Sequence, residues 1–198
     1  AEKVVYPFGY GLSYTSFDVE TVSAGVVNSN CTSETNKLYA KVRVTNTGKF
    51  SGKEVVQVYI AKPQGKLGKP AKELVAFEKT RELQPGESQL MILTWEINDM
   101  ASYDDLGKVK KSAYVLEAGS YDIYVGTSVR DVTKADYSYI LNHDVITEQL
   151  SAKLVPTSLP KRMLADGSYE ALPQSEPVDT DYSAIGNIDP SLTEGVAP

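Results

Sequence analysis

The sequence of 198 residues predicts an all-β sandwich of about seven strands with extended N- and C-terminal segments. Three observations support this fold class. Short segments within the first 146 residues alternate apolar and polar side chains with a period of two, which is typical of half-buried strands. Turns rich in glycine and proline separate these segments. No segment of similar length has the period of an amphipathic helix.

The strands can be placed in order along the chain. The first is expected over residues 14–23. The second, over residues 37–46, has the clearest alternation, and one of its faces is made by Leu38, Ala40, Val42 and Val44. After a turn, a third strand over residues 52–61 is expected to pair with the second in antiparallel order. Four more strands are predicted over residues 72–83, 87–97, 120–128 and 135–146.

Seven short strands with turns between them indicate an immunoglobulin-like or fibronectin type III-like sandwich. The immunoglobulin version usually joins its two sheets by a cysteine pair packed on a core tryptophan. Here Cys31 is the only cysteine, and Trp95 belongs to a different predicted strand. The fibronectin type III-like version is therefore favoured.

Composition excludes several classes of function. No apolar run approaches the roughly 18 residues that a membrane span needs. The net charge of −6 arises mainly after residue 165, and the basic residues form no cluster of the kind that binds nucleic acid. With one cysteine and one histidine, His143, a Cys/His metal site is excluded, and we expect no cofactor. The compartment is not indicated.

Two stretches fall outside the predicted sandwich, which is expected to occupy residues 14–148. Residues 149–198 read as an extended acidic linker or tail. Residues 1–13 contain a proline and two glycines that prevent a regular element, yet this stretch and the residue that follows it carry a large apolar area. We expect packing against a neighbouring domain by Tyr6, Pro7, Phe8, Tyr10, Leu12 and Tyr14.

Six motifs occur in a characteristic order. They are PFGYGLSYT (7–15), VTNTG (44–48), GKEVVQVY (52–59), PAKELVAFEKT (70–80), LQPGE (83–87) and EAGSY (117–121). In order and spacing they resemble the fibronectin type III-like domain of glycoside hydrolase family 3. The resemblance implies a parent enzyme that hydrolyses terminal β-D-glycosides, most often β-glucosides, with retention.

The same resemblance implies that the catalytic groups lie elsewhere. In this family the nucleophilic aspartate belongs to a barrel and the acid/base glutamate usually to an α/β domain, and no residue of this chain matches either position. Retaining hydrolysis needs two carboxylates about 5 Å apart. Asp104, Asp105, Glu117 and Asp122 are available, but their spacing does not bring any two together, so we expect them to be structural. No catalytic residue is assigned, and the chain alone is expected to be inactive.

Some family members have a permuted domain order, with the α/β domain and the sandwich before the barrel. The long stretch after the sandwich fits that order. Residues 1–13 would then leave a preceding α/β domain, and residues 149–198 would lead towards a barrel. The expected partners are the catalytic domains of the same polypeptide and, through the parent, its carbohydrate substrate.

Three functions compete at this stage. The first is a structural domain that stabilises the catalytic domains. The second is a polysaccharide-binding module, suggested by thirteen tyrosines and by the candidate stacking residues Tyr39, Tyr59 and Tyr124. Tyrosine is common in strands for other reasons, which weakens this alternative. The third, a cell-adhesion module, rests on fold analogy alone.

Overall fold

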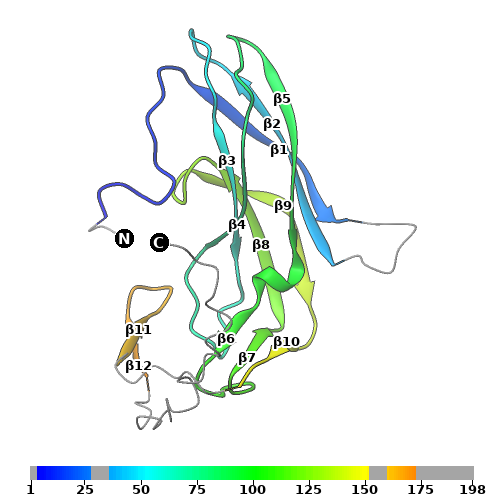
Figure 1. Ribbon diagram of the computed structural model, residues 1–198, viewed down its shortest axis with the longest axis vertical. Helices are drawn as coiled ribbons and strands as arrows, with labels where there is room; N and C mark the ends of the chain where they lie inside the picture. Colours follow the sequence, from blue (N-terminus) through cyan, green and yellow to red (C-terminus); the bar gives the residue numbers. More distant parts are fainter. Residues whose placement is uncertain (1–3, 28–35, 152–159, 173–198) are drawn as a thin grey trace, which may run out of the picture.

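The computed structural model describes residues 4–27, 36–151 and 160–172, and these residues form antiparallel β-sheets without an α-helix (Figure 1). The predicted all-β sandwich is confirmed. Within the described ranges, no helix has the length and apolar character needed to cross a membrane.

The first layer of the sandwich is a three-stranded sheet in the order β1-β2-β5. Its strands are β1 (Phe17–Val26), β2 (Lys37–Asn46) and β5 (Ser88–Glu96). The predicted alternation of β2 is confirmed, because the four side chains of its apolar face are fully buried.

The second layer is a four-stranded sheet in the order β4-β3-β8-β9. Its strands are β3 (Val55–Ala61), β4 (Glu73–Lys79), β8 (Gly119–Gly126) and β9 (Val132–Leu141). Strand β3 lies in its middle, and Val56, Val58 and Ile60 point into the core. The predicted pairing of this strand with β2 is wrong, because β3 pairs with β4 and β8 and faces β2 across the core. The core is closed from the other layer by residues such as Leu38 and Trp95, so both sheets contribute to one apolar interior.

A small third sheet covers one end of the sandwich. After a short 3₁₀ turn, Ile97–Met100, it is formed by β6 (Ser102–Asp104), β7 (Ala113–Leu116) and β10 (Val145–Gln149), in the order β10-β7-β6. Strands β6 and β7 were not predicted, because three or four residues are too few to show a period. The predicted strand over residues 135–146 is in fact two strands, since β9 ends at Leu141.

A hairpin lies within the stretch predicted as an extended linker. Strands β11 (Lys161–Met163) and β12 (Tyr169–Ala171) pair in antiparallel order, and Leu172 is buried directly after them. The connecting turn includes Gly167, whose positive φ of 85° suits glycine. Residues 152–159 and 173–198 of the predicted linker lie outside the described residues.

Candidate functional site

The N-terminal segment lies against the outer face of the four-stranded sheet, at Gln57 of β3. Gln57 alternates with Val56 and Val58 and therefore points away from the core. Its side-chain amide donates to the carbonyl of Thr127, at 2.5 Å, and to that of Gly9, at 3.4 Å. Gly9 has a positive φ of 81°, and a Cβ there would lie 2.2 Å from Oε1 of Gln57, so both the backbone conformation and the close approach favour glycine.

The turn between β8 and β9 holds the same segment from another side. The N–H of Val129 donates to the carbonyl of Phe8 at 3.0 Å, and the Arg130 guanidinium donates to the carbonyl of Val4 at 2.9 Å. Within the segment, the N–H of Tyr10 donates to the carbonyl of Pro7 at 3.0 Å and closes a turn. The backbone of the segment is thus fixed to the sandwich.

The side chains of this segment face solvent instead of packing on the sandwich. Tyr6 and Phe8 are 70% and 64% exposed, and Leu12 and Tyr14 are 90% and 97% exposed. Tyr10 is also exposed, and its ring centroid lies 5.2 Å from that of Tyr6. Pro7, the sixth predicted packing residue, is half-buried. These side chains together form an exposed apolar surface on an anchored backbone.

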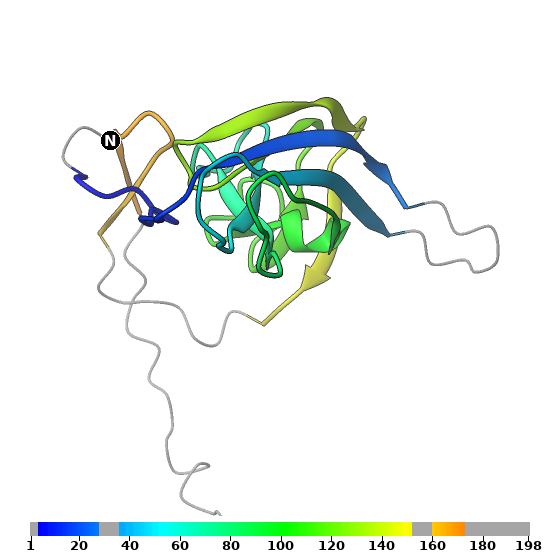
Figure 2. The same cartoon turned by 90° about the horizontal axis from the view of Figure 1, so that it is seen from above.

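Two further features lie on the same side of the molecule as this segment. In both views the dark blue N-terminal segment and the orange β11–β12 hairpin lie to the left of the sandwich (Figures 1 and 2). The loop that connects β3 to β4 reaches the hairpin, and the two line a common groove. We call residues 62–70 the anchored loop.

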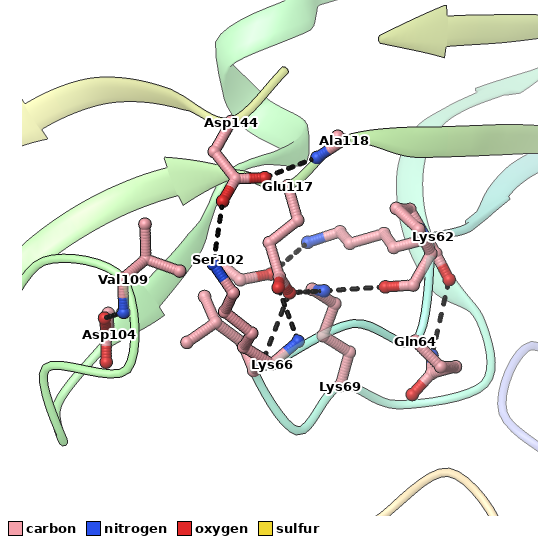
Figure 3. Close-up of polar contacts among 12 residues, drawn as sticks. Lys62, Gln64, Lys66, Lys69, Ser102, Asp104, Val109, Glu117, Ala118 and Asp144 are labelled. Carbon is pink, nitrogen blue, oxygen red and sulfur yellow. Dashed lines mark hydrogen bonds and ion pairs between the residues drawn. The ribbon is translucent and has the colours of Figure 1, made fainter. Parts of the chain in front are cut away.

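The buried carboxylate of Glu117 fixes the anchored loop (Figure 3). It accepts the backbone N–H groups of Lys66, at 2.5 Å, and Leu67, at 3.1 Å, and forms an ion pair with the buried ammonium of Lys69. Lys69 also donates to the carbonyl of Pro63 at 2.6 Å, which ties the two ends of the loop together.

A second set of charges holds the start and the tip of the anchored loop. Lys62 is buried and pairs with Glu73 at 2.5 Å. Burial lowers the pKa of Lys62, and the contact with Glu73 opposes that shift. Near the tip, the ammonium of Lys66 lies 3.4 Å from Asp144, which also accepts the N–H of Ala118 at 2.8 Å. The Ala118 N–H, more than Lys66, keeps the pKa of Asp144 low.

The anchored loop therefore has a fixed backbone and an exposed polar tip. Leu67 is buried in a small apolar cluster with Ala113 and Val115. Gln64 and Lys66 are exposed, and the side chain of Gln64 contacts the backbone of Lys62 (Figure 3). Buried ion pairs cost much of their attraction in lost hydration, so this network fixes a conformation more than it adds stability.

The carboxylates that the sequence made available are engaged in structural contacts. Asp104 is buried, which raises its pKa, but four backbone N–H donors from residues 107–110 outweigh burial and lower it. Asp122 pairs with Lys134 at 2.8 Å, and this contact lowers its pKa. Asp105 binds Arg162. Among the described residues, no group of three or more His, Cys, Asp or Glu residues could hold a metal ion.

The three tyrosines predicted to stack on sugars differ in their surroundings. Tyr59 is only 2% exposed and its hydroxyl donates to Gln57, so the expectation of stacking on Tyr59 is wrong. Its outward position on β3 suggested exposure, but the outer face is covered there. Tyr124 is half-buried beneath the ammonium of Lys72, 4.8 Å from the ring centroid. Tyr39 is half-buried beside Gly25.

Comparison with known proteins agrees with the fold. Residues 54–129 match the family model described as a fibronectin type III-like domain. The chain is 59% identical over 192 residues to β-glucosidase A of Butyrivibrio fibrisolvens, and the match covers 93% of this chain and 23% of the relative. It is 41% identical over 179 residues to a β-glucosidase of Ruminococcus albus, which covers 88% of this chain and 18% of the relative.

Solved structures give the same result. A β-glucosidase from Paenibacillus barengoltzii superposes with a TM-score of 0.75 at 44% identity, over 88% of this chain and 20% of that one. The chain thus spans about a fifth of the length of the relatives it matches. The fold is that of a fibronectin type III-like domain. The chain belongs to the domains of this kind that occur in glycoside hydrolase family 3.

Proposed function

We propose that this chain is a non-catalytic structural domain of a family 3 glycoside hydrolase. The parent enzyme would hydrolyse terminal β-D-glycosides, with β-glucosides as its main substrates. In this role the N-terminal aromatic segment packs against the catalytic domains of the same polypeptide and stabilises them. One observation carries the proposal: the backbone of the segment is hydrogen-bonded to the sandwich, while Tyr6, Phe8, Leu12 and Tyr14 remain exposed. The relatives named as β-glucosidases support the activity of the parent.

The energy available at this surface is sufficient for the role. Burying several large side chains gives several kcal/mol at about 25 cal/mol per Å² of apolar area. Part of the ordering cost is already met, because the segment's backbone is fixed before any partner binds. We place residues 1–13 at the exit of a preceding α/β domain, residues 14–148 in the sandwich and residues 149–198 in a linker that leads onwards. The match to the Butyrivibrio relative covers 93% of this chain, which supports counterparts in that relative for residues outside the sandwich as well.

The test compares the longer polypeptide with the isolated chain. Replacing Phe8 and Leu12 by serine should lower the melting temperature of the polypeptide that includes the catalytic domains, and leave that of the isolated chain unchanged. Ile92→Ser is the matched control, because Ile92 is also exposed but lies on β5 in the other sheet. Deleting residues 14–146 should lower the melting temperature further. An unchanged midpoint in both variants would refute the role.

Polysaccharide binding is the alternative function, and the partial exposure of Tyr39 and Tyr124 is the observation in its favour. Lys72 already occupies one face of the Tyr124 ring, which leaves less surface for a sugar. A pull-down of the isolated chain on insoluble cellulose and xylan decides between the two roles. Retention that Tyr124→Ala abolishes would support the alternative, and no retention would remove it.

A further inference from the structure

A groove of about 360 Å³ separates the anchored loop from the turn of the β11–β12 hairpin. We call it the loop–hairpin groove. Its volume is within the range of about 300–1,000 Å³ that is usual for small-molecule sites. One wall is formed by Gln64, Lys66 and their neighbours, and the other by Leu164, Ala165 and Asp166.

Both walls are held in place before any ligand arrives. Glu117 fixes the loop wall, as described above. On the hairpin side, Arg162 binds Glu170 at 2.9 and 3.0 Å and Asp105 at 3.1 Å, and Lys108 pairs with Glu170. A preformed site loses little conformational entropy on binding.

The lining offers donors, acceptors and an apolar strip with little net charge. Lys66 is 61% exposed and uses its ammonium in one contact of 3.4 Å, and the amide of Gln64 makes one contact of the same length. Asp166 uses Oδ1 for Ser168, so its second oxygen remains available as an acceptor. Leu164 and Ala165 supply the apolar surface. Because acidic and basic groups balance, the lining favours a neutral ligand over a phosphate or a cation.

We propose that the loop–hairpin groove is a subsite for a neutral saccharide. A sugar presents hydroxyl groups that both donate and accept, and C–H faces that can lie on Leu164 and Ala165. The groove lies on the same side of the sandwich as the N-terminal aromatic segment, and therefore beside the domain that this segment contacts (Figures 1 and 2). The proposal rests on the proposed function for the identity of the sugar, a β-linked oligosaccharide substrate held remote from the scissile bond.

The experiment is an amide chemical-shift titration of the 198-residue chain with cellobiose and, in a parallel arm, xylobiose. Saturable shifts are expected in residues 64–68 and 164–170. Lys66→Ala and Asp166→Asn should each weaken binding about tenfold, since each removes a charged hydrogen-bonding group. Lys49→Ala and Asp18→Asn are the matched controls, because both residues are exposed and lie outside the groove lining. Retained spectral dispersion shows that each variant is folded.

The outcomes are separable. No saturable shift with either sugar, or shifts that both groove variants leave unchanged, would overturn the proposed subsite. Shifts centred on Tyr39 or Tyr124 would also overturn it, in favour of aromatic stacking. The melting-temperature test of the N-terminal segment uses a different surface and a different measurement. Failure of that test with intact groove binding rejects the structural role only, and the reverse result rejects only the subsite.

Discussion

At the scale of single residues, Glu117 connects two parts of the chain that are far apart in sequence. It lies some fifty residues from the loop that it fixes, and both it and Lys69 are almost completely buried. A buried charge without its partner costs several kcal/mol. The pair should therefore behave as a unit.

Glu117→Gln keeps the size of the side chain and removes its charge, which leaves the Lys69 ammonium buried without an opposite charge. We expect the free energy of unfolding to fall by about 3–5 kcal/mol, measured by urea denaturation. The double variant Glu117→Gln with Lys69→Met should recover much of that loss, because no buried charge remains. If the double variant is as unstable as the single one, the loss does not come from the unpaired charge of Lys69.

Tyr121 should make the free energy of unfolding fall at alkaline pH. Its ring is 1% exposed and its hydroxyl donates to the carbonyl of Glu117 at 2.8 Å. Burial first, and then the nearby Glu117 charge, raises the pKa of Tyr121 above its ordinary value. The unfolded chain then loses this proton before the folded chain does. The stability that the protonated phenol contributes is complete below about pH 10 and is lost as pH rises above that value.

Tyr121→Phe should therefore flatten the alkaline limb of the stability curve. Removing the hydrogen bond should cost about 1 kcal/mol at neutral pH. Between about pH 10 and 11 the free energy of unfolding should fall less steeply in the variant than in the parent chain, by up to ~1.4 kcal/mol per pH unit. Urea midpoints across this range measure both effects. Tyr14→Phe is the control, because Tyr14 is 97% exposed. Equal slopes in all three proteins would contradict the assignment.

At the scale of elements, two ion pairs connect the β11–β12 hairpin to the rest of the chain, Lys108 with Glu170 and Asp105 with Arg162. Arg162 and Lys108 converge on Glu170, and Asp105 binds Arg162 from the loop after β6. The contact with Lys108, and then that with Arg162, lowers the pKa of Glu170. Partly exposed pairs of this kind are screened by salt. Because Arg162 and Lys108 share the carboxylate of Glu170, removing one member of this network should cost more stability than breaking an isolated ion pair.

Arg162→Ala should release the hairpin without unfolding the sandwich. Hydrogen exchange of peptides covering residues 160–172 should become faster in the variant, by about tenfold, while exchange in β2 and β3 stays slow. High salt should accelerate exchange of the same peptides in the parent chain. Arg43→Ala provides the control, since its exposed pair with Glu20 lies on the other sheet. Unchanged hairpin exchange would show that packing of Leu172, and not the ion pairs, holds this element.

The sequence predicted elements in proportion to their length. Strand β2, with ten residues, shows its alternation clearly, whereas β6, β11 and β12 have three residues each and show none. The break between β9 and β10 contains Asp144, whose contacts are not local in sequence. Asp144 accepts the N–H of Ala118 and pairs with Lys66, and neither partner is near it in sequence.

The candidate site was predictable only where its signal is local. The aromatic segment stands out because five large apolar side chains alternate with Pro7, Gly9 and Gly11 within a few residues. The anchored loop does not stand out in the sequence, because Glu117, which binds Lys69 of the loop, lies about fifty residues away. Tyr59 was misassigned for the same reason. Alternation places it on the outer face of β3, but nothing local shows that this face is covered.

At the scale of the whole molecule, the residues that stabilise the sandwich differ from the exposed apolar residues of the N-terminal segment. The interior is closed by the two main sheets, and the polar loops are fixed by their own carboxylates. The largest exposed apolar groups of the N-terminal segment therefore serve no purpose in the stability of this chain by itself. The proposed packing of these side chains against catalytic domains would account for both the anchoring of the segment and its exposure.

The isolated chain should consequently fold and yet hydrolyse no nitrophenyl β-glucoside or β-xyloside. Glycoside cleavage requires two carboxylates that face one sugar, one of them free to give or take a proton. Asp104 has its oxygens engaged by four backbone N–H groups, Glu117 is buried with Lys69, and Asp122 is paired with Lys134. Freeing any of them would break a contact that fixes the fold. Release of nitrophenol above a buffer blank would contradict this prediction, provided that Asp104→Asn, Glu117→Gln or Asp122→Asn abolishes the release while the protein remains folded.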